Sequence, residues 1–221
     1  MLKIAALFFF LISCTGMTKQ QKETILFFGD SITEQGMLPG GFITLMKGML
    51  KQQALDNKYE LIGAGIGGNK VYDLYLRMED DVLAKQPATV VVWIGVNDVW
   101  HKQFLRTGTD ADKFERFYKA IIKKLKDKNI KVVLCTPAAI GEKTDHSNAL
   151  DEDLDKYAGI IRTLAQNNGC ALIDMRKTFL DFNIANNKDN KPFGILTIDG
   201  VHLNDRGNEQ VAGEMMKALV K

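Results

Sequence analysis

Short apolar segments rich in β-branched residues alternate with segments of helical periodicity along most of this 221-residue chain. Helical spacing is clearest over 114–125 and recurs over 154–164, and a last helix is expected over 205–220 with Asn204 as its N-cap. Strands buried on both faces and separated by helices form a parallel sheet that is covered on both sides. The expected fold is a three-layer α/β/α sandwich with a five-stranded parallel, flavodoxin-like sheet, in one domain over 24–221. The five strands are expected at 24–29, 59–63, 89–94, 131–136 and 171–174.

The segments that follow these strands carry most of the chain's distinctive polar residues. Right-handed crossovers bring the carboxyl ends of parallel strands to one edge of the sheet, where ligands bind. A serine, several glycines, an asparagine and an Asp/His pair are therefore expected on one rim. The segments are Gly29-Asp30-Ser31 after the first strand, "GAGIGGNK" (63–70) after the second, "GVNDVWH" (95–101) after the third, and "TIDGVHLND" (197–205) before the last helix.

This set of residue types is what acyl transfer to a serine requires. A serine hydroxyl becomes a good nucleophile when a histidine takes its proton, and a carboxylate on the other ring nitrogen orients that histidine. The negative oxygen of the tetrahedral intermediate needs preorganised donors, which glycine amides and an asparagine side chain supply.

The same residues resemble a known family. "GDS", a glycine of the second block, "GVND" and "DGVH" resemble, in order and across essentially the whole domain, the four blocks of the SGNH (GDSL-type) hydrolases. The resemblance implies Ser31 as nucleophile, His202 as base and Asp199 as its orienting partner. It also implies an oxyanion hole from the Ser31 amide, the Gly68 amide and the Asn97 side chain, and a reaction that needs no metal or organic cofactor.

Two choices in this assignment have close competitors. Gly68 competes with nearby glycines and is chosen because "IGGN" is similar to the family's Ile-Ser-Gly-Asp pattern. The D-x-x-H spacing also occurs twice, since Asp98 precedes His101 by three residues. The second copy, before the last helix, is where the family has its dyad, so Asp98 is expected to support its loop instead. His101 and Trp100 are then candidates for lining the substrate cleft.

The family implies several ester substrates. "GDSITEQG" and "PGGF" resemble the branch that hydrolyses small acetate esters, so short acyl groups on glycans or small alcohols are expected. The alternatives are a lysophospholipase or thioesterase of the same family, or a non-catalytic carbohydrate-binding lipoprotein. With 29 Lys and Arg against 27 Asp and Glu, the charge balance gives no case for a nucleic-acid partner.

The first residues have the character of an export signal. One lysine precedes an apolar run over 4–12 that is too short to span a bilayer. "LISC" resembles a bacterial lipobox, which implies a signal peptide over 1–13, a lipid on Cys14 and a tether over 14–23. Thr15 follows Cys14, so the inner-membrane retention signal is missing and an outer-membrane lipoprotein is expected. The alternative is an ordinary secreted protein.

Two further cysteines, Cys135 and Cys170, lie in apolar strand-like runs and are expected to be buried free thiols. One is near the end of its strand and the other near the start of the next. In parallel neighbours these positions are too far apart for a disulfide.

Overall fold

The structure, a computed structural model, describes residues 22–221. Its centre is a five-stranded, all-parallel sheet with the strand order β2-β1-β3-β4-β5. This is the flavodoxin-like order, and it confirms the expected fold. The strands are β1 (Glu23–Gly29), β2 (Tyr59–Gly65), β3 (Thr89–Trp93), β4 (Lys131–Cys135) and β5 (Ala171–Ile173).

Two strands are longer than the sequence indicated. The Glu23 amide donates to the carbonyl of Lys58 at 2.8 Å, so β1 begins one residue before the expected start of the domain. β2 continues two residues further than predicted, because Phe28 and Gly29 of β1 pair with Ala64 and Gly65. The glycines in this segment weaken the sequence pattern of a strand, but pairing with β1 extends β2 over them.

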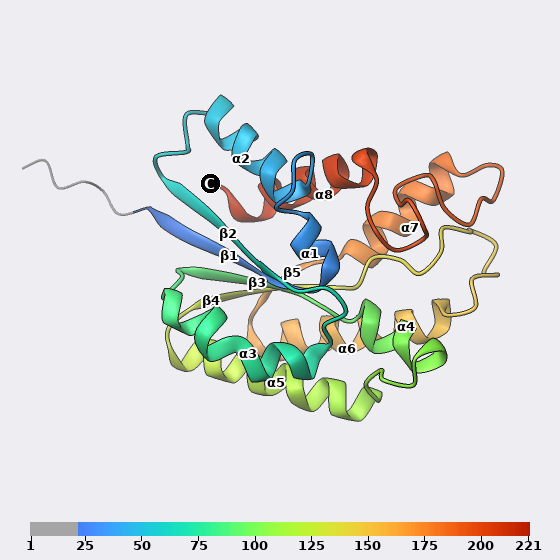
Figure 1. Ribbon diagram of the computed structural model, residues 1–221, viewed down its shortest axis with the longest axis horizontal. Coiled ribbons are helices and arrows are strands. Elements are labelled where there is room, and N and C mark those ends of the chain that lie inside the picture. The colour runs from blue at the N-terminus through green and yellow to red at the C-terminus, as the bar shows by residue number, and fades with distance from the viewer. Residues whose placement is uncertain (1–21) are drawn as a thin grey trace, which may run out of the picture.

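Helices cover both faces of the sheet (Figure 1). α1, α2, α7 and α8 pack on one face, and α3, α5 and α6 pack on the other. The last helix begins as predicted, since the Asn204 side chain accepts the Gly207 amide at 2.9 Å. The helices are α1 (Ser31–Gln35), α2 (Phe42–Gln52), α3 (Val71–Asp81), the 3-10 turn η1 (Leu83–Lys85), α4 (Val96–Phe104), α5 (Ala111–Asp127), α6 (Asp151–Asn168), α7 (Met175–Asn186) and α8 (Asp205–Leu219).

The continuous apolar run of β1 follows from its central position. Ile25 and Phe27 pack in the core beneath α2 and α8, while Leu26 and Phe28 pack in the core on the opposite face. All four are at most 1% exposed. A strand with two buried faces requires apolar side chains at successive positions, which is why this segment shows no alternation.

The cysteine prediction is half right. Cys135 is buried in β4 and Cys170 is a free thiol as well, but Cys170 is only partly buried. Cys135 pairs in register with Ile173, three residues beyond Cys170, which explains the absence of a bond between these two. Cys170 is partly open because it precedes β5, an edge strand in which Leu172 is 38% exposed.

The site lies where the strand order changes direction, because β2 is on one side of β1 and β3 is on the other. The segments leaving β1 and β3 therefore start side by side, with Gly29 opposite Trp93. In Figure 1 the strands point toward the end of the molecule that carries α1 and α4.

Among residues 22–221, the helices are too short or too polar to cross a bilayer. The predicted signal peptide and Cys14 lie outside the described residues.

Candidate active site

The segment after β1 presents Ser31 as the first residue of α1. Asp30 is the N-cap, and its Oδ1 accepts the Ile32 amide at 3.0 Å, so Ser31 is not used as a cap. α1 lies directly on the strand ends. A Cβ on Gly29 would come within 2.5 Å of the Trp93 carbonyl oxygen, and one on Gly65 within 2.1 Å of the Glu34 amide nitrogen. Both positions therefore require glycine.

Ser31 is the first member of a chain of three side chains. Its Oγ donates to His202 Nε2 at 3.0 Å, and His202 Nδ1 donates to Asp199 Oδ2 at 2.6 Å. The other Asp199 oxygen accepts the amides of His202, at 2.8 Å, and Val201, at 2.9 Å. The carboxylate is thus fixed by three donors. It holds the proton on Nδ1 and leaves Nε2 free to accept from the serine.

Asp199 is suited to remain charged in this position. Burial alone would raise its pKa, but the hydrogen bond from the His202 ring and those from the two amides outweigh burial, and the pKa lies below its usual value. The side chain is 43% exposed, whereas that of His202 is 20% exposed. An ionised carboxylate in this position is able to stabilise an imidazolium on the neighbouring histidine.

The segment after β2 passes beside the serine. Gly68 has φ +75°, a left-handed conformation that favours glycine, and a Cβ built on Gly67 would lie 4.0 Å from Cβ of Ser31. Asn97, 4% exposed, donates one Nδ2 hydrogen to the carbonyl of Asn69 at 3.1 Å. A primary amide has two N–H donors, so the second remains for a ligand oxygen.

Two buried carboxylates support these segments. Asp98 is fully buried and accepts the Val71 amide at 3.2 and 3.3 Å, which ties α4 to the start of α3. Burial raises the pKa of Asp98 to about 7, and the charge of Asp30 adds to the rise. Burial also raises the pKa of Asp30 to about 6, with the amide of Ile32 opposing the rise. Both residues stabilise turns, and for Asp98 this is the role that the sequence indicated.

Trp100 and His101 are consecutive residues of α4, and the centroids of their rings are 5.7 Å apart. Trp100 lines a cavity of about 160 Å³ together with Ile140, Asp199 and Val201. His101 Cε1 is 4.0 Å from the position of a Cβ on Gly68, and its buried Nδ1 has no hydrogen-bond partner among residues 22–221. Burial and the Lys70 charge lower the pKa of His101. His101 Nδ1 therefore has no partner within 22–221, and the Asp98 carboxylate accepts the Val71 amide instead. The first D-x-x-H copy does not form a dyad.

Three charged residues at this edge make contacts within the protein that the sequence did not indicate, and Lys70 is not the solvated lysine that was expected. Lys70, 7% exposed, donates from Nζ to the Gly68 carbonyl at 2.9 Å. Glu142, 1% exposed, accepts the amides of Ile195 and Leu196 just before Asp199. Arg77 reaches the ends of β1 and β2 from α3. No local pattern marks them, because charged residues in helices and loops ordinarily face solvent.

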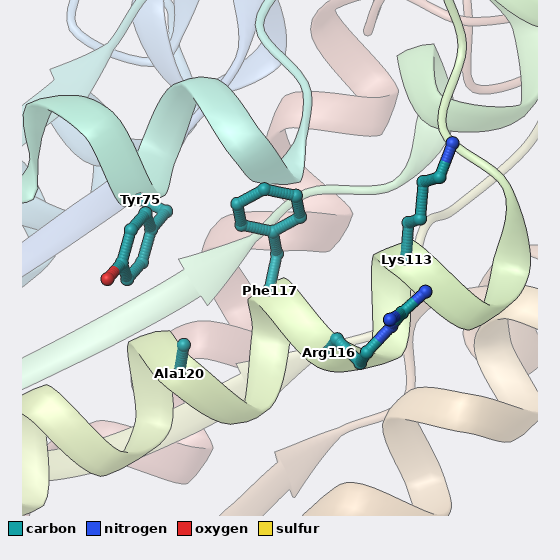
Figure 2. A pocket seen from close by; sticks show the side chains of 5 residues that line it. All are labelled: Tyr75, Lys113, Arg116, Phe117 and Ala120. Carbon is teal, nitrogen blue, oxygen red and sulfur yellow. The ribbon is translucent and has the colours of Figure 1, made fainter.

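A larger hollow elsewhere lacks this chemistry. Figure 2 shows a groove between α3 and α5 that is lined by Tyr75, Lys113, Arg116, Phe117 and Ala120. Tyr75 and Phe117 meet edge to face, with ring centroids 5.6 Å apart. The lining contains neither a serine nor a histidine. Within 22–221, moreover, no three His, Cys, Asp or Glu residues are grouped to hold a metal ion.

Comparison with known proteins agrees with the geometry. The GDSL-like lipase/acylhydrolase family matches residues 27–210. A solved acetyl xylan esterase is 62% identical, with a TM-score of 0.89 over 89% of this chain and 100% of that one. The acetylxylan esterase of Geobacillus stearothermophilus is 27% identical over 172 residues, 71% of this chain and 78% of the enzyme. A crystal structure of an acetylxylan esterase from that organism has a TM-score of 0.77 at 24% identity, over 93% of this chain and 97% of that one. The chain belongs to the GDSL-like lipase/acylhydrolase family and is a serine esterase of the SGNH type.

Proposed function

We propose that this protein removes acetyl groups from the sugar hydroxyls of xylan-type glycans, with Ser31 as nucleophile, His202 as general base and Asp199 as its orienting partner. The observation that carries the chemistry is the hydrogen-bonded chain from Ser31 through His202 to Asp199 at the carboxyl edge of the sheet. The glycan substrate is supported by similarity to the 62% identical acetyl xylan esterase.

In the acylation step, Ser31 Oγ attacks the acetyl carbonyl while His202 Nε2 takes the hydroxyl proton. The resulting imidazolium is stabilised by Asp199. The carbonyl oxygen becomes negative and is held by the amides of Ser31 and Gly68 and by the free N–H of Asn97. The first N–H groups of a helix have no intrahelical partner, so the Ser31 amide at the start of α1 is suited to this role. The intermediate collapses when His202 protonates the sugar oxygen, which leaves as the alcohol.

Deacylation repeats these steps with water. His202 removes a proton from a water molecule that attacks the acetyl-serine carbonyl, and the same donors hold the oxyanion. His202 then returns the proton to Ser31 as acetate leaves. The cycle consumes one water per ester and regenerates the free enzyme.

The sugar is placed by Trp100 and His101 in this proposal. Trp100 lines the cavity beside Asp199, and aromatic rings pack well against the apolar faces of sugars. His101 lies next to Gly68, with a lowered pKa that favours a neutral ring able to donate and accept hydrogen bonds. These two neighbouring side chains, with ring centroids 5.7 Å apart, would contact the sugar together.

The test combines the serine with a substrate series. Ser31→Ala is expected to abolish both fluorophosphonate labelling and release of acetate from acetylated xylooligosaccharides. Ser147→Ala, a change at an exposed loop serine, is the matched control and should retain both. Undiminished labelling of Ser31→Ala would overturn the assignment of the nucleophile.

Nitrophenyl esters of increasing acyl length test the acyl preference. The proposal expects kcat/KM to be highest for acetate and to fall steeply with longer chains. A maximum at long acyl chains would favour a lysophospholipase or thioesterase instead. Absence of hydrolysis of every ester would favour the carbohydrate-binding lipoprotein.

The proposal extends to the first 23 residues, of which 1–21 lie outside the described part. "LISC" supports cleavage before Cys14, attachment of acyl chains to Cys14 and anchoring in the outer membrane. Each buried methylene contributes about 0.8 kcal/mol, so two or three chains give stable anchoring. Labelled palmitate should enter the wild-type protein and not Cys14→Ala, which should become soluble in the cell extract. Equal labelling of the two proteins, or a soluble wild type, would contradict the anchor.

A further inference from the structure

Arg77 has an unusual environment for a helix residue with polar neighbours. It lies on α3, yet its side chain is 15% exposed and turns back toward the sheet. The guanidinium lies 4.5 Å from the centre of the Phe28 ring, so α3 contacts the carboxyl end of β1 through this side chain. Stacking of this kind orients the plane of the guanidinium as well as burying it.

The guanidinium joins the ends of two neighbouring strands. Nη2 donates to the carbonyl of Gly29 at 2.8 Å and to that of Ala64 at 3.0 Å. Gly29 is the last residue of β1, two positions before Ser31. Ala64 lies at the end of β2, just before the loop that contains Gly68. One nitrogen therefore fixes the chain that leads to the nucleophile and the chain that leads to the oxyanion loop.

A third contact reaches the loop itself. Arg77 Nε donates to Asn69 Oδ1 at 2.7 Å, and the main-chain carbonyl of the same Asn69 accepts from Asn97 at 3.1 Å. Asn69 directly follows Gly68. Its position is therefore set by Arg77 on one side and by Asn97, a proposed oxyanion donor, on the other.

The fourth hydrogen bond of the Arg77 guanidinium is to a residue of its own helix. Nη1 donates to Asp81 at 2.7 Å, one helical turn further along α3. In the hydrogen bonds of residues 22–221, Asp81 pairs with Arg77 and with neither strand end, so it neutralises the guanidinium without taking part in the geometry of the loops. A lysine could satisfy the charge of Asp81, but a single ammonium could not span the acceptors on Gly29, Ala64 and Asn69, because only the planar fork of arginine has donors in fixed directions.

We infer that Arg77 is a positioning residue that sets the spacing between the Ser31 nucleophile and the oxyanion donors Gly68 and Asn97. It contacts no reacting atom and acts through the ends of β1 and β2 and through Asn69. The inference rests on the proposed roles of Ser31, Gly68 and Asn97. Displacements of about 1 Å at a reacting centre are enough to lower rates on the order of 10²-fold, so loss of this clamp should be seen in kcat.

The experiment compares Arg77→Lys, Asn69→Ala and the control Asp81→Asn in hydrolysis of p-nitrophenyl acetate. Arg77→Lys and Asn69→Ala should lower kcat by about 10- to 100-fold with KM within about 3-fold, and Asp81→Asn should leave both constants nearly unchanged. Asn69→Ala removes the loop acceptor while leaving Arg77 in place, so it tests the same contact if Arg77→Lys folds poorly.

A second readout separates positioning from simple stabilisation. A trifluoromethyl ketone forms a negatively charged adduct with the nucleophile, and its Ki should rise by the same factor as kcat falls. The effects of Arg77→Lys and Asn97→Ala should also be less than additive, because both act on one oxyanion site. In an Arg77→Gly variant, added methylguanidine should restore part of kcat.

The inference would be overturned by a kcat within 2-fold of wild type in Arg77→Lys, or by a fall in melting temperature with kcat and Ki unchanged. Fully additive effects with Asn97→Ala would overturn it as well. Ser31→Ala is run in parallel. If Ser31→Ala keeps its activity, the proposed nucleophile is wrong; if Ser31→Ala is inactive and Arg77→Lys is normal, only the role of Arg77 fails.

Discussion

Glu142 Oε1 accepts the amide of Leu196 at 2.6 Å, across 54 residues of chain. Its other oxygen accepts the amide of Ile195 at 2.7 Å, and the neighbouring Gly141 amide donates to the carbonyl of Gly200 at 2.8 Å. The turn that carries Asp199 and His202 is thus bound to the segment after β4. Asp199 and His202 therefore lie on a turn that is held by a carboxylate outside the proposed triad.

Glu142→Gln is therefore expected to weaken both stability and activity. The amide group of glutamine would place an N–H donor against one of the two backbone amides, and a lost hydrogen bond to a buried charged group costs roughly 1.5–3 kcal/mol. Chemical denaturation should show a loss of about that size, and kcat for p-nitrophenyl acetate should fall. Glu152→Gln, on the exposed side of α6, is the control and should change neither. Wild-type stability and kcat in Glu142→Gln would show that the turn with Asp199 and His202 does not depend on Glu142.

Asn97→Ala should lower kcat by about 10²–10³-fold, the usual effect of losing one oxyanion donor. KM should change little, because this donor acts mainly on charge that develops in the transition state. Steady-state kinetics with a nitrophenyl ester measures both constants. A variant that raised KM at constant kcat would instead place Asn97 in ground-state binding.

His202→Ala and His101→Ala distinguish the two D-x-x-H copies. Removing the general base should lower kcat on the order of 10⁴–10⁶-fold. His101→Ala should affect mainly KM for glycan substrates, since His101 adjoins Gly68 and does not contact Ser31 in the described hydrogen bonds. If His101→Ala were the inactive variant, the assignment of the base would be wrong.

Asp98 makes stability depend on pH. Its folded pKa, about 7, lies above its unfolded value near 3.9, so the folded state binds the proton more tightly. The stability that this group contributes is complete below pH 4 and is lost as the pH rises through 7. Between pH 5 and 8 the loss is on the order of 2–3 kcal/mol.

Asp98→Asn tests this pH dependence. The free energy of unfolding should fall less steeply between pH 5 and 8 in the variant than in the wild type. The remaining slope includes Asp30, whose folded pKa is about 6. Parallel pH profiles of the two proteins would contradict the buried, raised pKa of Asp98.

The parts of the site that were predictable are those with a local pattern. Ser31, Asn97, Asp199 and His202 lie in short motifs, and the strand order of a doubly wound sheet brings such motifs to one edge. Arg77 carried no such signal, because its helix has charged neighbours and its acceptors are main-chain carbonyls 13 and 48 residues away. Periodicity tells which residues face a core, whereas the partners of a buried charge depend on the tertiary structure.

Ser31 and His202 are 171 residues apart in the chain, and α8 is held near the nucleophile by the Asn208 side chain, which accepts the Phe42 amide at 2.9 Å. A nascent chain emerging from the ribosome therefore has its proposed nucleophile early and its proposed base only near the end of synthesis. An amino-terminal fragment that stops before His202 lacks the proposed base and cannot hydrolyse an ester by this route. In a refolding reaction, the return of hydrolysis should therefore report the contact between these two distant segments, which formation of the central strands alone does not provide.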